Sequence, residues 1–206
     1  MSTKKLFIVR HGETDFNKLG IVQGSGVDSP LNETGLEQAR MFYEFYAHVP
    51  FDKVYISALQ RTKQSVQQFL NAQFPHEVLP ELNEISWGIY EGQQSSVDWK
   101  ADYWQMIKHW NDGVYDVCVP GGETPAQLQV RQKKALQHIM SKEEEQLILI
   151  CMHGRAMKSF LCLLLEKELR CMEDFPHVNL CLYELEYAHG KFNLIRENDT
   201  VHLNVS

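Results

Sequence analysis

Two histidines and two arginines stand at or shortly after the ends of apolar segments, and their residue types suit phosphate chemistry. Arg10 and His11 follow the first apolar run, His153 follows a later one, and Arg61 comes soon after a third. Guanidinium groups bind phosphate oxygens in a bidentate manner and stay charged at physiological pH. A neutral imidazole can attack phosphorus as a nucleophile, and nearby cations stabilise the transferring group. These residues therefore predict phosphoryl transfer without a metal ion.

Each of these residues also has an ordinary structural interpretation. A histidine after a strand is commonly a hydrogen-bonded structural group, and an arginine at a helix start is commonly a solvated surface residue. The coincidence of such residues at three separate strand ends favours a function. Zinc binding is a rival use of the histidines, but the sequence has no HExxH motif and no Cys/His pair at ligand spacing. Two nearby arginines would also repel a cation, so we expect no metal and no cofactor.

The elements that must position these residues alternate between strand and helix. Segments with helical spacing separate several of the apolar runs, which predicts a three-layer α/β/α fold with a mostly parallel central sheet. The expected strands are Lys5–Val9, Lys53–Ile56, Gln146–Met152, Leu180–Leu185 and Phe192–Ile195. Capping boxes are expected at Thr34-x-x-Glu37, Ser57-x-x-Gln60 and Thr124-x-x-Gln127. Ligands of such sheets bind beyond the carboxyl ends of the strands, where the histidines and arginines would meet.

Length and composition exclude several classes of protein. The 206 residues predict one domain over 1–206, since domains have ~150 residues. Twenty Lys and Arg against 27 Asp and Glu give a formal charge of -7, which argues against a general nucleic-acid partner. No apolar run approaches the ~18 residues that span a membrane. The five cysteines form no CxxC pair, so we expect reduced thiols and a cytoplasmic location. The sequence gives no indication of oligomeric state.

Taken together and in order, these motifs resemble those of the histidine phosphatase superfamily, the phosphoglycerate mutase-like proteins. The matching segments are Leu6–Thr14 with its RHG motif, Asn17, Gln23-Gly24, Asp28–Gly35, Ser57–Thr62, Leu82–Glu84, Gly88, Glu91-Gly92, Pro120–Thr124, His153-Gly154 and the tail Asn198–Leu203. A single element such as His-Gly is unspecific, whereas the ordered set covers nearly the whole chain. The tail is similar to that of the small phosphatase branch.

The resemblance implies a role for each matching position. His11 would be the nucleophile that becomes phosphorylated, and Glu84 would donate a proton to the leaving oxygen. The phosphoryl oxygens would be held by Arg10, Arg61 and His153. The other substrate-binding positions are Asn17, Gln23, Gly24 and Gly154. His11 must be neutral to attack phosphorus, and the neighbouring arginines favour its neutral form. His153 would instead need to be protonated in order to offer a positive charge to the phosphate.

Several residues keep open alternatives at this point. Without the flanking motif, Glu84 would be interpreted as a surface carboxylate in a loop, and Glu81 and Glu91 are nearby candidates for its role. Arg155 stands where many relatives have a second glycine. It could reach a second anion of the substrate or lie on the surface at a helix start.

The segment 85–119 is expected to form a small helical cap beside the pocket. It is acidic and holds all four tryptophans, so a tri-anionic phosphoglycerate fits it less well than a partly apolar or ring-bearing substrate. Trp99, Tyr103, Met106 and Trp110 share a helical face and are expected to pack in the interior. Whether Trp87 and Trp104 line the pocket stays open.

The expected function is metal-independent hydrolysis of small phosphomonoesters, as in a histidine acid phosphatase-type enzyme. One alternative is a cofactor-dependent phosphoglycerate mutase. A second is an inactive relative that only binds phosphorylated ligands, although binding alone needs neither His11 nor Glu84. The sequence does not choose the physiological substrate.

Overall fold

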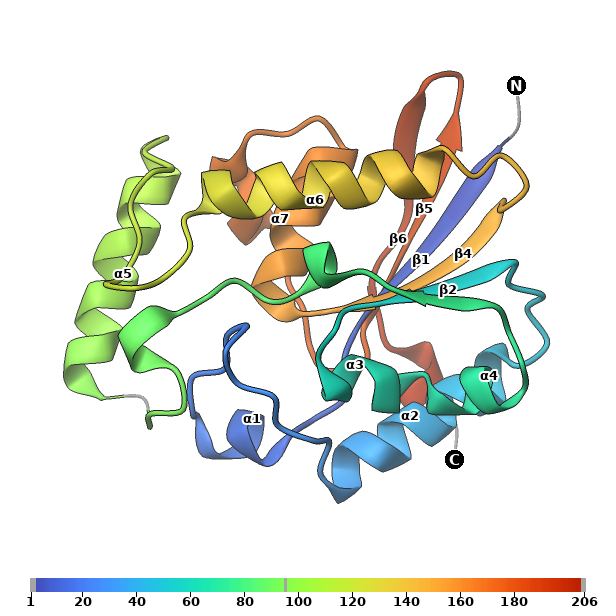
Figure 1. Ribbon diagram of the computed structural model, residues 1–206, viewed down its shortest axis with the longest axis horizontal. Helices are drawn as coiled ribbons and strands as arrows, with labels where there is room; N and C mark the ends of the chain where they lie inside the picture. Colours follow the sequence, from blue (N-terminus) through green and yellow to red (C-terminus); the bar gives the residue numbers. More distant parts are fainter. Residues whose placement is uncertain (1–2, 95, 205–206) are drawn as a thin grey trace.

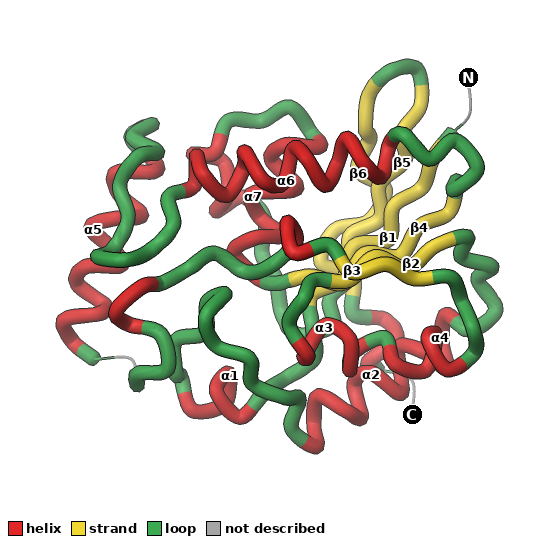
Figure 2. Tube along the Cα trace, viewed as in Figure 1, coloured by secondary structure: helices red, strands yellow, loops and turns green. Residues whose placement is uncertain are grey.

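A single mixed sheet of six strands forms the centre of the protein (Figures 1 and 2). The computed structural model describes residues 3–94 and 96–204. The strands lie in the order β3-β2-β4-β1-β5-β6. Their bounds are β1 Lys4–Arg10, β2 Lys53–Ile56, β3 His76–Val78, β4 Leu147–Met152, β5 Leu182–Ala188 and β6 Lys191–Asp199. The strands β1 to β4 are parallel to one another, and β5 and β6 are antiparallel.

Helices cover both faces of the sheet, so the predicted three-layer α/β fold is confirmed. Helices α6 and α7 lie on one face, and α2, α3 and α4 lie on the other (Figure 1). The α-helices are α1 Asp15–Leu19, α2 Glu33–Tyr46, α3 Gln60–Ser65, α4 Gln67–Asn71, α5 Val97–Asn111, α6 Pro125–Met140 and α7 Gly154–Leu164. Short 3-10 helices are η1 Pro80–Leu82, η2 Gly88–Tyr90, η3 Leu169–Asp174 and η4 Val201–Leu203.

The alternation of side chains along β1 divides the apolar core into two layers. Leu6 and Ile8 pack in the cluster that includes α6 and α7, whereas Phe7 and Val9 pack in the cluster with α2 and α4. Successive residues of a strand point to opposite faces, so each layer takes every second residue. This two-sided burial explains the unbroken apolar character of β1 and β4.

The sheet departs from the expected elements at its two edges. Strand β3 was not predicted because its three residues are partly or fully exposed and carry no apolar alternation. At the other edge, His189 and Gly190 join β5 to β6 with φ angles of 55° and 84°. Positive φ at both turn positions is typical of a two-residue hairpin loop, which makes these strands antiparallel.

One predicted capping box is correct and two are wrong. Thr124 caps α6 in a complete box with Gln127. Helix α2 begins earlier than expected, because the Asn32 side chain accepts the Gly35 N–H at 2.9 Å and places Thr34 inside the helix. Helix α3 begins only at Gln60 and has Leu59 as its N-cap residue, so Ser57 lies before the helix, where its hydroxyl bonds His153.

Helix α5 lies at the side of the molecule, away from the sheet (Figure 1). Its residues Trp99, Met106 and Trp110 are buried as predicted and join the core layer beneath α6 and α7, whereas Tyr103 is only partly buried and packs against that layer. The segment 85–119 thus holds η2 and α5, and its role as a cap stays a prediction. Among the described residues, no helix has the length and apolar character needed to cross a bilayer.

Candidate active site

The carboxyl ends of β1, β2 and β4 meet at one edge of the sheet, as parallel neighbours must. Arg10 is the last residue of β1 and His11 follows it, Arg61 comes soon after β2, and His153 directly follows β4. His11, Arg61 and His153 are at most 3% exposed. The two imidazole ring centroids lie 5.2 Å apart, with an angle of 56° between the ring planes. The structure therefore brings together the residues that the sequence placed at separate strand ends.

His11 is held as a neutral imidazole with a free outer nitrogen. Its Nδ1 lies 2.7 Å from the Gly12 carbonyl oxygen, which can only accept, so Nδ1 carries the ring proton. Burial, with Arg10 and Arg61 adding to it, holds the pKa of His11 well below its usual range. The unprotonated Nε2 therefore has its lone pair available, as a nucleophile requires.

His153 is also neutral, and both of its ring nitrogens are engaged within the protein. Arg61 Nε donates to Nδ1 over 3.2 Å, which leaves the ring proton on Nε2, 2.8 Å from the Ser57 hydroxyl oxygen. Burial and the Arg61 charge hold the pKa of His153 well below its usual range. His153 therefore lacks, before substrate binds, the positive charge that the sequence analysis expected it to need.

Arg61 connects this histidine to the loop after α1. Its Nη1 donates to the Val27 carbonyl at 2.7 Å and its Nη2 to the Gly24 carbonyl at 3.3 Å. Burial lowers the pKa of Arg61 to about 10, so the guanidinium remains charged at neutral pH. Arg61 thus serves as both a positive charge and a structural link.

The side chain of Glu84, which belongs to the loop after η1, lies against the N-terminal end of α7. One carboxylate oxygen accepts the N–H groups of Ile85 and Ala156 at 2.9 and 2.7 Å, and the other accepts that of Arg155 at 3.0 Å. The side chain is 7% exposed, so Glu84 is not a surface carboxylate. The N–H groups of Arg155 and Ala156 are free groups of the first turn of α7, and they fix the carboxylate beside His153, the N-cap residue of that helix.

The rival carboxylate Glu91 has a different position. It accepts the Trp87 N–H at 2.8 Å, and a side chain at Gly24 would collide with it. Glu91 thus supports the loop at Gly24. Glu81 contributes its main-chain carbonyl to Arg131, which also binds the carbonyls of Asn83 and Glu84 and so shapes the Glu84 loop.

Asn17 and Gln23 lie side by side around Thr14. The Asn17 Oδ1 accepts bonds from Thr14 and, at 3.2 Å, from Asn179 Nδ2, so its own amide nitrogen is the group left for a ligand. Gln23 bonds the hydroxyls of Thr14 and Ser29. Gln23 therefore positions its neighbours within the loop.

Arg155 is neither a surface residue nor free to bind a second anion, the two alternatives that the sequence left open. It is 8% exposed, so it is not a surface residue, and its guanidinium bonds Glu173 and the Tyr103 hydroxyl. It also lies 5.7 Å from the centroid of the Trp110 ring. Arg155 therefore ties α5 to α7 and η3, and its charge is neutralised by Glu173.

Of the two tryptophans left open, one borders a cleft next to the predicted site. A cleft of about 310 Å³ is lined by Trp87 and Trp99 together with Asn17, Gln23 and residues of the loop between them. Trp104, by contrast, is 66% exposed and does not line this cleft. An aromatic wall therefore adjoins Asn17.

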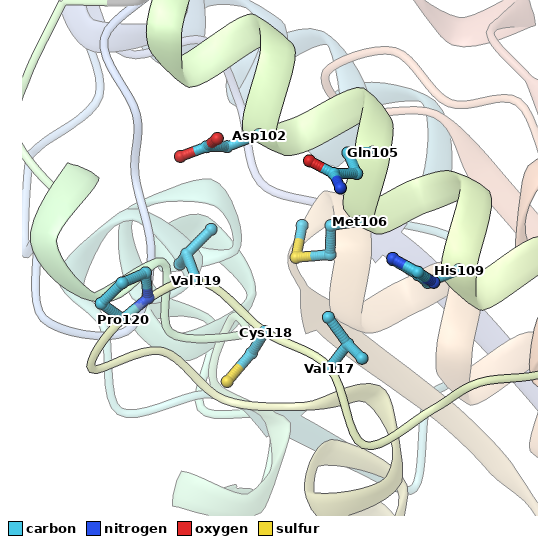
Figure 3. A pocket seen from close by; sticks show the side chains of 8 residues that line it. All are labelled: Asp102, Gln105, Met106, His109, Val117, Cys118, Val119 and Pro120. Atoms are coloured by element: carbon cyan, nitrogen blue, oxygen red, sulfur yellow. The ribbon is translucent and has the colours of Figure 1, made fainter.

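A further cavity of about 290 Å³ lies between α5 and the residues 117–120. Figure 3 shows Asp102, Gln105, Met106 and His109 of α5 facing the segment Val117–Pro120 across it. None of the predicted site residues lines this cavity.

Several residues that shape the site were not predicted from the sequence. Ser57 orients His153, Ser65 accepts the Gly12 N–H at 2.9 Å, and Asn179 donates to the His11 carbonyl at 3.1 Å. His177 lies against Arg10, with its Nδ1 3.3 Å from Arg10 Nη1. Ser57 and Ser65 stand close to Arg61 in the sequence, and this proximity could have indicated that they belong to the site. The loop 176–180 precedes its strand, whereas the sequence analysis looked for site residues after strands, so it gave no such indication.

Within the part of the chain that the structure describes, no three His, Cys, Asp or Glu side chains gather as a metal site would require. The fold and the strand-end residues define an α/β protein with two neutral imidazoles and two guanidinium groups at one sheet edge. The family model of the histidine phosphatase superfamily (branch 1) matches residues 6–200. The protein belongs to this superfamily.

Several relatives of known name are phosphatases. Fructose-2,6-bisphosphatase TIGAR B of Danio rerio is 29% identical over 197 residues, which cover 93% of this chain and 72% of that protein. The adenosylcobalamin/alpha-ribazole phosphatase of Salmonella typhimurium is 39% identical over 88 residues, 42% of this chain and 43% of the relative. The matches span about half of several other relatives, such as mouse TIGAR at 48%.

Solved structures match over nearly the whole chain. A phosphoserine phosphatase of Entamoeba histolytica in complex with phosphoserine superposes with a TM-score of 0.83 and 27% identity, covering 97% of this chain and 99% of that one. The alpha-ribazole phosphatase of Shigella flexneri has a TM-score of 0.83 at 24% identity, covering 95% and 96%. The latter likeness shows the shared fold.

Proposed function

We propose that the protein is a phosphomonoesterase that forms a phosphohistidine on His11 and needs no metal ion. The observation that carries this proposal is the neutral His11, with Nε2 free and with Arg10 and Arg61 beside it. Its membership in a family of named phosphatases supports hydrolysis as the reaction.

The proposed reaction has two steps. The Nε2 lone pair of His11 forms a bond to phosphorus as the ester P–O bond breaks, and the leaving oxygen takes a proton from Glu84, which enters this step as the protonated acid and leaves it as the carboxylate. Water then attacks phosphorus, gives a proton to the Glu84 carboxylate, and the N–P bond breaks with its electron pair returning to His11. Arg10 and Arg61 would stabilise the transferring phosphoryl group, and Asn17 and the main chain at Gly24 and Gly154 would contact it.

The substrate class is proposed to be small phosphomonoesters, with preference for a ring-bearing leaving group. Trp87 at the cleft beside Asn17 supports this preference, because a flat ring can pack against an aromatic wall. The relatives named above act on chemically different esters. Alpha-ribazole 5′-phosphate, phosphoserine and 3-phosphoglycerate therefore form the test panel, with p-nitrophenyl phosphate as a general substrate.

The test is phosphate release from this panel in the presence of a chelator, together with acid-quench trapping of the phosphorylated enzyme. We expect release that survives the chelator, a trapped phosphohistidine, and loss of both in His11→Ala. Transfer of phosphate between positions of 3-phosphoglycerate without release would instead identify a mutase. Binding without turnover would identify a phospholigand-binding protein.

We also propose a cytoplasmic location. All five cysteines are free, and Cys151, Cys162 and Cys181 are buried, which suits a reducing compartment. Burial raises the pKa of the Cys181 thiol to about 11, so it is not a reactive thiolate at neutral pH. Fractionation of the source cells with an antibody against the protein would test this location.

A further inference from the structure

His177 is a histidine at the phosphate end of the site to which the family motifs assign no role. It lies in the loop 176–180, which leads into β5. This loop is fastened to the nucleophile's own strand end, because the Leu180 N–H donates to the Arg10 carbonyl at 3.2 Å and Asn179 donates to the His11 carbonyl. The position of His177 is therefore fixed relative to His11.

The hydrogen bonding of His177 determines where its ring proton lies. Arg10 Nη1 is a donor that cannot accept, so the His177 Nδ1 at 3.3 Å must be the acceptor. Burial and the Arg10 charge lower the pKa of His177 to about 3, which keeps the ring neutral at neutral pH. The single ring proton therefore stays on Nε2.

This Nε2–H has no acceptor among the described residues, and a second donor without a partner lies near it. Arg10 Nε is buried and makes no hydrogen bond within the described chain. A Cβ atom placed on Gly154 would lie 3.0 Å from His177 Nε2 and 3.4 Å from Arg10 Nε. Both donors thus converge on the first residue of α7, and only glycine at position 154 allows the His177 ring to lie so close.

The convergence of donors at a helix start is suited to an anion. His153 differs from His177 in this respect, because its two ring nitrogens are already used by Arg61 and Ser57. The imidazole that offers a free N–H next to Arg10 is therefore that of His177.

We propose that His177 is a substrate-binding residue, whose Nε2–H donates to an oxygen of the phosphoryl group beside Arg10. This inference rests on the proposed phosphatase function. It adds a donor from the loop 176–180 to the family's set of phosphate ligands.

Two substitutions separate this role from a merely structural one. In His177→Asn, the side-chain oxygen replaces Nδ1 and can still accept from Arg10, but the Nε2 donor is lost. In His177→Gln, the amide nitrogen can replace the Nε2 donor, whereas the Nδ1 acceptor is lost. His48→Asn changes an exposed histidine after α2 and is the matched control.

The measurement is the dissociation constant of inorganic phosphate by calorimetric titration, with KM and kcat for p-nitrophenyl phosphate alongside. We expect His177→Asn to bind phosphate roughly 10- to 100-fold more weakly, as loss of a hydrogen bond to a charged group predicts. Recovery of binding in His177→Gln would strengthen the assignment. Phosphate binding by His177→Asn as tight as that of the parent would overturn it.

Two further outcomes remain decisive. If His177→Asn fails to fold, His177→Gln is compared with His177→Phe, and equal phosphate binding by these two would overturn the proposal. Failure of the phosphatase proposal is recognised separately, since the parent would then release no phosphate and form no phosphohistidine. The titration does not depend on turnover and still reports on His177.

Discussion

Arg61 and His153 share a hydrogen bond of 3.2 Å in which the guanidinium Nε donates to the imidazole Nδ1. A cation that donates to a histidine fixes that histidine in the neutral state, because a protonated ring would have no lone pair to offer. The proton on Nε2 is then directed at Ser57, 2.8 Å away. The second histidine of the site is thus oriented from both sides.

The first prediction concerns Ser57. Ser57→Ala removes the partner of His153 Nε2, so the ring loses one of its two anchors. We expect kcat for p-nitrophenyl phosphate to fall roughly 10-fold, the effect of one hydrogen bond of ordinary strength. Ser57→Thr keeps the hydroxyl and should retain more activity than alanine. Equal loss in both variants would contradict the role of the hydroxyl.

The second prediction concerns the leaving group. Glu84→Gln removes the proposed proton donor, and general acid catalysis contributes about 10²- to 10⁴-fold when the leaving group is poor. We expect a large loss of kcat/KM for phosphoserine and a much smaller loss for p-nitrophenyl phosphate, whose phenolate leaves unaided. A loss of equal size for both substrates would argue against Glu84 as the acid.

The third prediction concerns stability at acid pH. The pKa values of His11, His153 and His177 are lowered by folding, so below pH ~6.5 the unfolded chain binds protons that the folded chain does not. The free energy of unfolding should therefore fall as pH drops from 7.5 to 5.5, by about 1.4 kcal/mol for each such histidine. Urea unfolding at the two pH values measures this difference.

Glu173 acts in a different pH range and serves as the internal check. Its pKa is lowered to about 2, mainly by Arg155 against an opposing effect of burial, so its contribution is lost only as pH falls below ~4.5. Glu173→Gln should leave the change in stability between pH 7.5 and 5.5 as it is in the parent. An unchanged urea midpoint in the parent over that range would refute the histidine assignment.

The fourth prediction concerns the link that Arg155 makes between α5, α7 and η3. Arg155→Met removes a buried cation that bonds Glu173 and Tyr103, and we expect a loss of about 3 kcal/mol in the free energy of unfolding. KM for p-nitrophenyl phosphate should stay near the parent value, because Arg155 is turned toward the aromatic residues of α5.

Arg170→Met is the matched control for this change, since Arg170 pairs with Glu168 at the surface and should contribute less than about 1 kcal/mol. A large increase of KM in Arg155→Met at an unchanged free energy of unfolding would instead show that Arg155 contacts the substrate.

The sequence predicted the parts of the fold and site that depend on local pattern. Strands β1 and β4 are apolar because both of their faces are buried, and the residues that follow them had to meet at one edge. His177 could not be found in this way, because it precedes a strand and lies on a loop whose position depends on hydrogen bonds to residues about 168 positions away. The two alternatives left open for Arg155 did not include its buried position, because its partner Glu173 belongs to a later element.

The two neighbours of β1 in the sheet come late in the chain: β4 begins at Leu147 and β5 at Leu182. The ribosome therefore releases β1 long before either neighbour exists, and synthesis at roughly 5–20 residues per second leaves it unpaired for many seconds. An apolar strand with both edges open is prone to pair with other chains. Premature termination after α7 would leave one such edge permanently open and would remove the loop that holds Arg10 and His11. The last strands to be made thus decide whether the first one becomes part of an enzyme or of an aggregate.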